Sequence, residues 1–303
     1  MIDSSNLHGV LPAIPTPVTA EDHIDVVATR HLVENLINQG VTGLVPLGGT
    51  GEYGSLSRQD RIRMAEITVQ ASKGRVPVIP GVLDPGYYDA MQAANEFAAV
   101  GADAVMLLTP YYTRPTQDGI RDYYLRFADE SPLPVLIYEI PYRTQVSISP
   151  DMLHVLSRHE RIIGMKACNT DMYHFLRTIA GVDDSFAVLS GEDTLFPLHL
   201  VAGARGGIVV TASVLPRPWL DMYAKLRDGK LDEALALHRS LMPLLSLAFS
   251  ETNPGPLKSV MDLVGVDAPH VLRPLTSPES SLEAKLRVEL QAQLDAFGGR
   301  AKA

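Results

Sequence analysis

Short hydrophobic runs alternate with longer amphipathic stretches along the first two thirds of the chain. The runs are apolar at nearly every position, a pattern typical of parallel strands that helices cover on both faces. They predict eight β-strands, at residues 9–14, 43–47, 77–80, 104–108, 134–138, 162–166, 186–189 and 207–210.

The stretches between these runs have the spacing of helices. Apolar residues recur there at positions i, i+3 and i+4, which places them on one face of a helix. The pattern is clearest at residues 26–38, 58–72, 90–100 and 117–128. Eight strands that alternate with helices indicate an α/β fold, a (β/α)8 TIM barrel.

After Pro216 the pattern becomes entirely helical. Predicted helices cover residues 219–226, 231–249, 256–264 and 282–297. The first of them completes the barrel, and the others form an added segment. We therefore expect a (β/α)8 barrel over residues 1–228, which carries the active site, and a C-terminal helical segment over residues 229–303.

Composition narrows the class of protein. Hydrophobic residues make up 46% and charged residues 20% of the 303 residues, as in a folded soluble protein. The net charge of −9, without a basic run, argues against a nucleic-acid partner. No apolar stretch approaches the roughly 20 residues of a membrane span, and the first residues do not resemble a signal peptide. We expect a cytoplasmic protein without a membrane partner.

Cysteine and histidine usage bears on cofactors. The single cysteine, Cys168, excludes an internal disulfide and agrees with a reducing compartment. The nine histidines are scattered, without a His-Glu-x-x-His motif or paired cysteines. We therefore expect no metal and no cofactor.

Lys166 is the strongest candidate for chemistry, because it closes a predicted strand at the end where barrel active sites gather. A lysine is almost fully protonated at neutral pH and cannot then attack a carbonyl. An apolar environment, which Ile162, Ile163 and Met165 could supply, favours the nucleophilic amine. The alternative is a lysine that only marks a strand end and faces solvent.

A glycine-rich loop follows the second predicted strand, at residues 48–56. The spacing of Gly49, Gly51 and Gly54 satisfies the dinucleotide pattern, so a nicotinamide-dependent oxidoreductase is one interpretation. Two features argue against the dinucleotide interpretation. The loop follows the second strand rather than the first, and the next strand is apolar until Asp84, so no acidic residue ends it. The other interpretation is a loop whose N–H groups, with the Thr50 hydroxyl, bind a small carboxylate.

Tyr138 is the last residue of the fifth predicted strand, and Arg143 follows five residues later. A tyrosine at the barrel mouth can shuttle protons, although a buried structural tyrosine is the alternative. Arg143 can hold a carboxylate through two hydrogen bonds, although a surface ion pair is the alternative.

Several ordered motifs resemble those of the dihydrodipicolinate synthase and N-acetylneuraminate lyase family of class I, Schiff-base aldolases. They are Gly-Gly-Thr-Gly-Glu at 48–52, Thr-Pro-Tyr-Tyr-Thr-Arg-Pro at 109–115, Tyr-Glu-Ile-Pro-Tyr-Arg-Thr at 138–144, Gly-Met-Lys at 164–166, Ser-Gly at 190–191 and Gly-Ile-Val-Val-Thr at 207–211. The resemblance covers nearly the whole chain.

The resemblance implies a role for each matching residue. Lys166 would form an iminium with the C2 carbonyl of pyruvate or a related 2-oxo acid, and Tyr138 would transfer protons. Tyr112 would complete a proton relay from an adjacent subunit. The remaining substrate contacts would come from Gly49, Thr50, Gly51, Glu139, Arg143 and Ile208. The second substrate would be an aldehyde, and the chain would form a homotetramer or homodimer.

Departures from the family pattern bear on the substrate. Gly49 stands where the family usually has a Thr or Ser whose hydroxyl links the tyrosines, Glu139 replaces a common Asn, and Tyr142 replaces a small residue. Because of these departures, two hypotheses stand for the activity. One is a 4-hydroxy-tetrahydrodipicolinate synthase, and the other is an aldolase or dehydratase of 2-keto-3-deoxy sugar acids. A non-catalytic relative that binds 2-oxo acids is a third hypothesis.

Overall fold

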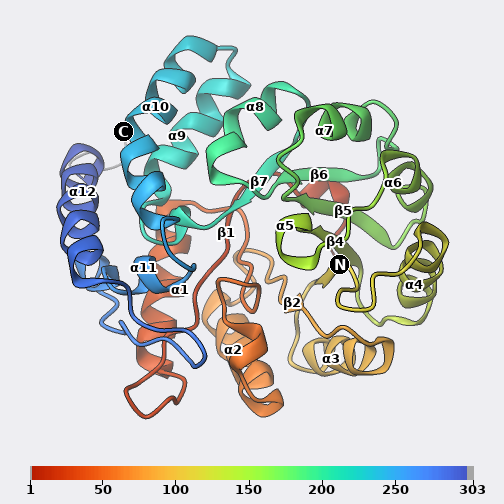
Figure 1. The fold of residues 1–303 in the computed structure, drawn as a ribbon, viewed down its shortest axis with the longest axis horizontal. Coiled ribbons are helices and arrows are strands. Elements are labelled where there is room, and N and C mark those ends of the chain that lie inside the picture. The colour runs from red at the N-terminus through yellow and green to blue at the C-terminus, as the bar shows by residue number, and fades with distance from the viewer. Residues whose placement is uncertain (1, 299–303) are drawn as a thin grey trace.

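A curled parallel sheet forms the centre of the molecule, in a computed structural model that describes residues 2–298 (Figure 1). Its strands are β1 (Gly9–Pro12), β2 (Gly81–Val82), β3 (Val105–Leu108), β4 (Val135–Glu139), β5 (Ile162–Ala167), β6 (Ala187–Ser190) and β7 (Gly206–Val209). They pair in the order β1-β7-β6-β5-β4-β3-β2, and every pair is parallel.

The predicted strand at 43–47 fills the gap between β1 and β2. The amide of Val45 donates to the carbonyl of Pro12 at 3.0 Å, and that of Leu44 donates to the carbonyl of Pro77 at 2.9 Å. Neighbouring Pro46 and Pro80 have no N–H group, so no regular ladder forms here. The strand predicted at 77–80 contributes only an isolated bridge between Val78 and Leu44, and the regular strand β2 follows it at Gly81–Val82. The backbone bonds nevertheless close the ring, and the predicted (β/α)8 barrel is confirmed.

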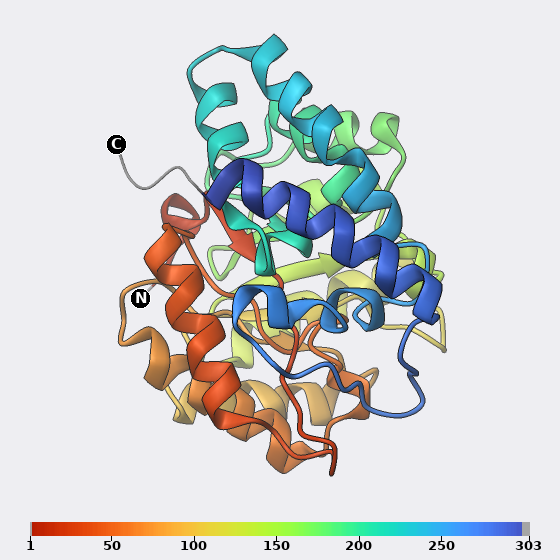
Figure 2. The same cartoon turned by 90° about the vertical axis from the view of Figure 1, so that its left-hand side faces the viewer.

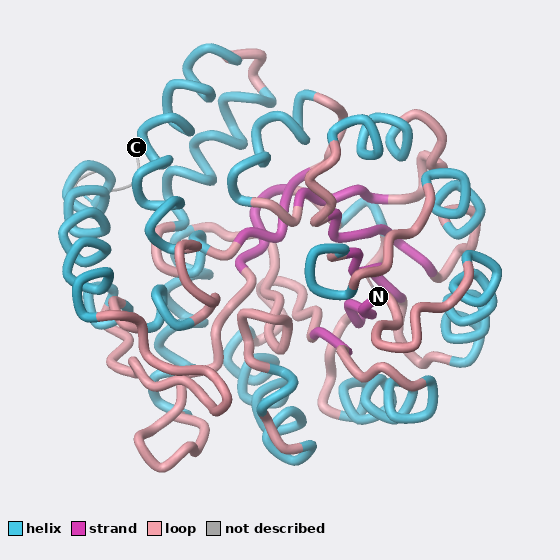
Figure 3. The backbone as a smooth tube through the Cα atoms, viewed as in Figure 1, coloured by secondary structure: helices cyan, strands magenta, loops and turns pink. Residues whose placement is uncertain are grey.

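Helices surround the sheet, as the tube drawing in Figure 3 shows. The outer helices are α1 (Val26–Gln39), α2 (Arg58–Ser72), α3 (Tyr87–Ala99), α4 (Gln117–Glu130), α6 (Pro150–Leu156), α7 (Met172–Ile179), α8 (Phe196–Val201) and α9 (Pro216–Arg227). Polar side chains cap many of their first turns: Asp25 accepts from the amide of Ala28, and Ser57 accepts from that of Asp60. Such caps define where a helix begins after a loop.

Short helical turns sit in the connections between these elements. They are η1 (Ser4–Asn6), η2 (Tyr53–Ser55), α5 (Pro141–Thr144), η3 (Asp193–Leu195) and η4 (Thr211–Ser213). Of these, α5 begins directly after the end of β4, where it holds the segment that carries Arg143 beside the mouth of the barrel.

The C-terminal part is helical, as predicted. It contains α10 (Leu231–Ala248), α11 (Gly255–Lys258), η5 (Met261–Val264) and α12 (Ser280–Gly298), and α12 packs against α10 and α11 (Figure 2). The helix predicted at 256–264 is divided, because Val260 has a φ of −123°, outside the helical region.

One hydrophobic core includes buried residues of the barrel and of the C-terminal helices, among them Leu241 and Leu245 of α10. The division of the chain after residue 228 stays a prediction. Within residues 2–298, no helix is both long and apolar enough to cross a membrane.

Candidate active site

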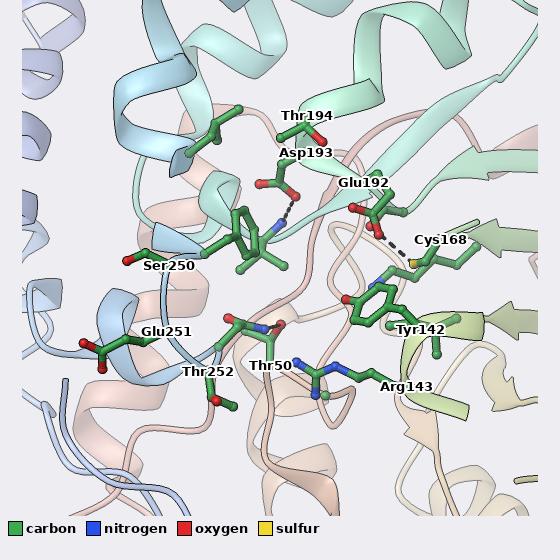
Figure 4. Close-up of a pocket in the computed structure, with 18 of the residues that line it drawn as sticks. Thr50, Tyr142, Arg143, Cys168, Glu192, Asp193, Thr194, Ser250, Glu251 and Thr252 are labelled. Carbon is green, nitrogen blue, oxygen red and sulfur yellow. Dashed lines mark hydrogen bonds between the residues drawn. The ribbon is translucent and has the colours of Figure 1, made fainter. Parts of the chain in front are cut away.

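A cavity of about 900 Å³ opens at the carboxyl ends of the strands (Figure 4). Five of the predicted site residues line it: Gly49, Thr50, Tyr138, Arg143 and Lys166. Other parts of its wall come from the turn after β6, from the end of α10 and from the connection between α10 and α11. The structure thus brings together residues that lie more than a hundred positions apart in the sequence, at the face of the barrel where active sites form.

Lys166 lies near the end of β5, a strand whose residues are all buried. It is 4% exposed, so it does not face open solvent, as a lysine that merely ends a strand would. In the sheet Lys166 pairs with Tyr138 of β4, and its Nζ lies 4.7 Å from the centre of the Tyr138 ring. Among residues 2–298, no carboxylate lies within salt-bridge distance of this amine. A buried amine without a carboxylate partner is suited to nucleophilic attack.

Tyr138 is 3% exposed, and its side chain lines the same cavity. Burial raises the pKa of the Tyr138 phenol well above its usual value, the nearby Cys168 raises it further, and the Arg143 guanidinium lowers it. The phenol is therefore protonated at neutral pH, and it can donate a proton to an oxygen bound above Lys166.

The glycine loop holds Thr50 at the edge of the cavity. The Thr50 Oγ1 accepts a hydrogen bond of 2.9 Å from Nδ2 of Asn253. Gly51 permits the tight turn, since a Cβ there would lie 2.5 Å from the backbone nitrogen of Leu47. The carbonyl of Gly51 in turn accepts from the Thr16 hydroxyl at 2.7 Å. These contacts fix the Thr50 hydroxyl and the loop backbone at a cavity that Lys166 also lines.

A buried ion pair secures this loop. Oε1 of Glu52 lies 2.6 Å from Nζ of Lys258, and both side chains are fully buried. The other carboxylate oxygen accepts from the amide of Leu272 at 2.6 Å, and Lys258 also donates to the carbonyl of Thr16 at 2.8 Å. Burial lowers the pKa of Lys258, and the charge of Glu52 opposes that shift. The pair connects the glycine loop to the C-terminal segment.

The missing side chain at Gly49 leaves space that Arg143 borders. A Cβ on Gly49 would lie 3.1 Å from Nη1 of Arg143 and 4.0 Å from the hydroxyl of Tyr138. Arg143 belongs to α5, and among the described residues it forms no salt bridge. An unpaired guanidinium therefore lies at the mouth of the cavity, next to the phenol.

Four predicted site residues do not line the cavity: Gly51, Tyr112, Glu139 and Ile208. Tyr112 is 91% exposed with a left-handed φ of 70°, so its ring points away from this chain's own site. Ile208 is fully buried within β7. The expected position of Glu139 at the mouth is corrected, because neighbouring strand residues face opposite sides and Tyr138 faces inward.

Glu139 lies instead in a buried polar cluster behind the strand. Its Oε1 accepts from the Ser147 hydroxyl at 2.8 Å and from the amide of Ile148 at 3.1 Å, and Nε2 of His174 lies 3.7 Å away. Burial raises the pKa of Glu139, and the facing His174 opposes this.

The structure adds cavity residues to which no sequence signal assigned a role. Glu192, Glu251 and Asn253 line the cavity, the first after β6 and the others in the connection between α10 and α11. Burial, together with the neighbouring Asp193, raises the pKa of Glu192 to about 7. The position of Glu192 directly after a strand end was the one feature of the sequence that could have indicated a role in the site. Nothing in the pattern around residues 251–253 indicates that this helical connection reaches the barrel mouth.

Asp193 has a structural function at this wall. It is buried and accepts hydrogen bonds from the amides of Val210 and Thr211 and from the Thr211 hydroxyl, at 2.7–2.9 Å. Within residues 2–298, no three histidine, cysteine or acidic side chains lie close enough together to hold a metal ion.

Sequence comparison identifies the relatives of the chain. The sequence model of the Dihydrodipicolinate synthetase family matches residues 6–293. The 4-hydroxy-tetrahydrodipicolinate synthase of Acidiphilium cryptum is 37% identical over 283 residues, which cover 93% of this chain and 97% of that one. The enzyme of the same name from Methanothrix thermoacetophila is 36% identical, with coverage of 96% and 98%.

Solved structures agree with these relatives. A dihydrodipicolinate synthase from Bacillus anthracis superposes with a TM-score of 0.92 at 32% identity, covering 96% of this chain and 99% of that one. An Escherichia coli K12 prophage protein of the same family, solved with pyruvate, superposes with a TM-score of 0.87 at 26% identity, with coverage of 95% and 98%. The chain therefore belongs to the dihydrodipicolinate synthetase family, whose members are class I aldolase-type enzymes.

Proposed function

We propose that this protein is a carbon–carbon lyase or synthase that acts on pyruvate or a related 2-oxo acid through a Schiff base at Lys166. The observation that carries the proposal is the position of Lys166, a buried amine that lines the cavity 4.7 Å from the ring of Tyr138. The pyruvate complex of the Escherichia coli relative supports this class of ligand.

The reaction begins when the neutral amine of Lys166 attacks the C2 carbonyl of the 2-oxo acid, which forms a C–N bond and, after proton transfer, a carbinolamine. Tyr138 then donates its proton to the carbinolamine oxygen, which leaves as water when the C–O bond breaks. The product is an iminium, and Tyr138 remains as a phenolate. The phenolate takes a proton from C3, which regenerates the phenol and leaves an enamine that can attack an aldehyde.

Thr50 and the amides of its loop are placed to hold the carboxylate of the oxo acid. The Thr50 hydroxyl is fixed by Asn253, and the loop backbone is fixed by the close approach at Gly51. Hydrogen bonds that are positioned before the substrate arrives do not have to be organised during the reaction. This arrangement would orient C2 of the oxo acid toward Lys166.

Reductive trapping tests the proposal. Incubation with pyruvate and borohydride should add one reduced pyruvate to the intact protein, and peptide mapping should place it on Lys166. Lys73 and Lys230, which lie outside the cavity, should stay unmodified. Equal labelling of the parent and of Lys166→Ala, or no adduct in the parent, would reject a Schiff base at this residue and favour a non-catalytic binding relative.

A second candidate function is an aldolase or dehydratase of 2-keto-3-deoxy sugar acids. Three acidic residues, Glu192, Asp193 and Glu251, line the cavity together with Arg143 and Lys166. Carboxylates accept hydrogen bonds from hydroxyl groups and repel a second carboxylate, which favours a polyhydroxylated substrate. Parallel assays decide between them: pyruvate with aspartate semialdehyde, and 2-keto-3-deoxy sugar acids alone. Efficient condensation in the first assay with no turnover in the second would establish the 4-hydroxy-tetrahydrodipicolinate synthase.

We also propose a cytoplasmic homodimer or homotetramer. The exposed Tyr112, held at a left-handed φ, supports a contact with another copy of the chain. Exposed apolar side chains on α7 and α8 support further association: Tyr173, Leu176, Leu198 and Val201. We name these four residues the α7–α8 patch. Stacking of Phe175 on His199, with ring centres 3.9 Å apart, shows that the two helices are neighbours.

A further inference from the structure

We propose that Arg143, admitted beside Tyr138 by the missing side chain at Gly49, is a positioning residue that stabilises the negative charge left on Tyr138 during imine formation. The inference rests on the proposed Schiff-base chemistry and assigns Arg143 a task in the first half-reaction, before any second substrate binds.

The first argument is spatial. The nearest atoms to a Cβ at Gly49 belong to the guanidinium of Arg143, at 3.1 and 3.6 Å, followed by the Tyr138 hydroxyl at 4.0 Å. A contact of 3.1 Å is tighter than a carbon atom normally accepts, so a side chain at position 49 would displace the guanidinium from the place that it now occupies by a few tenths of an ångström. Gly49 has no left-handed φ, so its conformation does not require glycine. The effect of glycine at this position is therefore the space that it leaves for the guanidinium of Arg143.

The second argument concerns charge. When Tyr138 protonates the departing hydroxyl, the C–O bond breaks, water leaves, and the phenolate that remains is 3% exposed. A buried anion requires a cation or several hydrogen bonds. The groups that act on Tyr138 are Cys168 and Glu192, which disfavour the phenolate, and Arg143, which favours it. Lys166 is by then part of the iminium. The positive charge of the iminium is lost when the enamine forms, whereas the guanidinium of Arg143 stays charged and is the described side chain outside the reacting group that favours the phenolate.

The third argument is that Arg143 forms no salt bridge with a carboxylate among the described residues. Two arginines of α2 show the contrast, because they have carboxylate partners: Arg61 pairs with Asp84 at 3.0 Å, and Arg58 pairs with Glu96. Arg143 has none among residues 2–298, although it lies 5.9 Å from the Tyr142 ring centre. A guanidinium without a carboxylate partner keeps its full charge available to the phenolate.

The test measures the rate of imine formation with pyruvate alone, by quenching with borohydride at successive times. We expect Arg143→Gln to be roughly tenfold to a hundredfold slower than the parent, and Gly49→Ala to be about tenfold slower. In the double variant, the alanine should cause no further loss, because its effect acts through Arg143. Gly54→Ala is the matched control in the same loop, since nothing lies within 4 Å of a Cβ there.

Two outcomes of the kinetic test would overturn the inference. If the effects of Gly49→Ala and Arg143→Gln multiply in the double variant, the two residues act independently. If Arg143→Gln forms the imine at the parent's rate and only raises the KM of an aldehyde substrate, Arg143 is a substrate contact and nothing more.

A second measurement separates this inference from the proposed function. 3-Fluorotyrosine placed at position 138 can be titrated by fluorine NMR without any substrate. Its acid dissociation constant should fall about tenfold in Arg143→Gln and in Gly49→Ala, and stay unchanged in Gly54→Ala. No change in the first two variants would refute the charge contact, even if the parent protein forms the adduct. A parent that forms no adduct but shows these shifts would reject the Schiff base and retain the contact.

Discussion

Tyr138 illustrates how two adjacent strands combine their chemistry at the level of single residues. Its phenol is protonated because burial raises its pKa, and its pairing with Lys166 in the sheet fixes the distance between ring and amine. Tyr138→Phe should therefore lower turnover by about 10² to 10⁴ while the fold is preserved, since only a hydroxyl is removed. Steady-state assays and circular dichroism check both parts. Tyr173→Phe, at an exposed position, is the control, and unchanged turnover in Tyr138→Phe would reduce the hydroxyl to a packing role.

Glu192 gives a prediction about pH. Burial raises its pKa in the folded state to about 7, whereas the unfolded chain has the ordinary value of about 4.3. The folded state therefore holds a proton that the unfolded state has lost between these pH values. The contribution to stability is fully present below pH 4 and is lost as the pH rises through 7, by roughly 2 kcal/mol after allowance for screening.

The neutral variant Glu192→Gln lacks this penalty. Its melting temperature should equal that of the parent at pH 4 and exceed it at pH 8, and differential scanning fluorimetry at the two pH values measures this. Glu279→Gln, a substitution outside the cavity, should show no such dependence. A parent and Glu192→Gln that melt alike at pH 8 would contradict the raised pKa.

The ion pair of Glu52 and Lys258 decides stability at the level of elements, because it joins the glycine loop to α11. Breaking a buried pair by removing one partner leaves an uncompensated charge and costs about 3 to 5 kcal/mol. We expect Lys258→Met to be destabilised by this amount in thermal unfolding. The double variant Glu52→Gln with Lys258→Met should recover part of the loss, because neither charge remains. A double variant that loses the sum of both single effects would show that the pair itself is unimportant.

The elements show how far sequence reasoning reaches. Continuous apolar runs and helical spacing predicted the barrel and its strand ends, and with them the positions of Thr50, Tyr138 and Lys166. The irregular pairing of the segment at 43–47 was not predictable from the apolar pattern, since it depends on Pro46 within the segment and on Pro80 in the next one. The orientation of Glu139 required the strand register, and the contribution of Glu251 and Asn253 required the tertiary path after α10.

At the scale of the whole molecule, the α7–α8 patch leads to a prediction about assembly. Its side chains are 45–71% exposed on two neighbouring helices, and contiguous exposed apolar surface usually marks an interface. Light scattering coupled to size exclusion should show a dimer or tetramer, and Leu176→Glu combined with Val201→Lys should reduce its mass. Val288→Lys, an exposed apolar position on α12, is the control. A monomeric parent would contradict the predicted assembly.

The ion pair between Glu52 and Lys258 also has a consequence for folding during synthesis on the ribosome. The two residues are 206 positions apart, and chains grow at about 5 to 20 residues per second. Lys258 is therefore synthesised roughly 10 to 40 seconds after Glu52, and Leu272, whose amide donates to the same carboxylate, is synthesised later still. Until then the carboxylate stays hydrated and the glycine loop stays open. The glycine loop of the nascent barrel therefore gains these two contacts only after residues 258 and 272 have been synthesised.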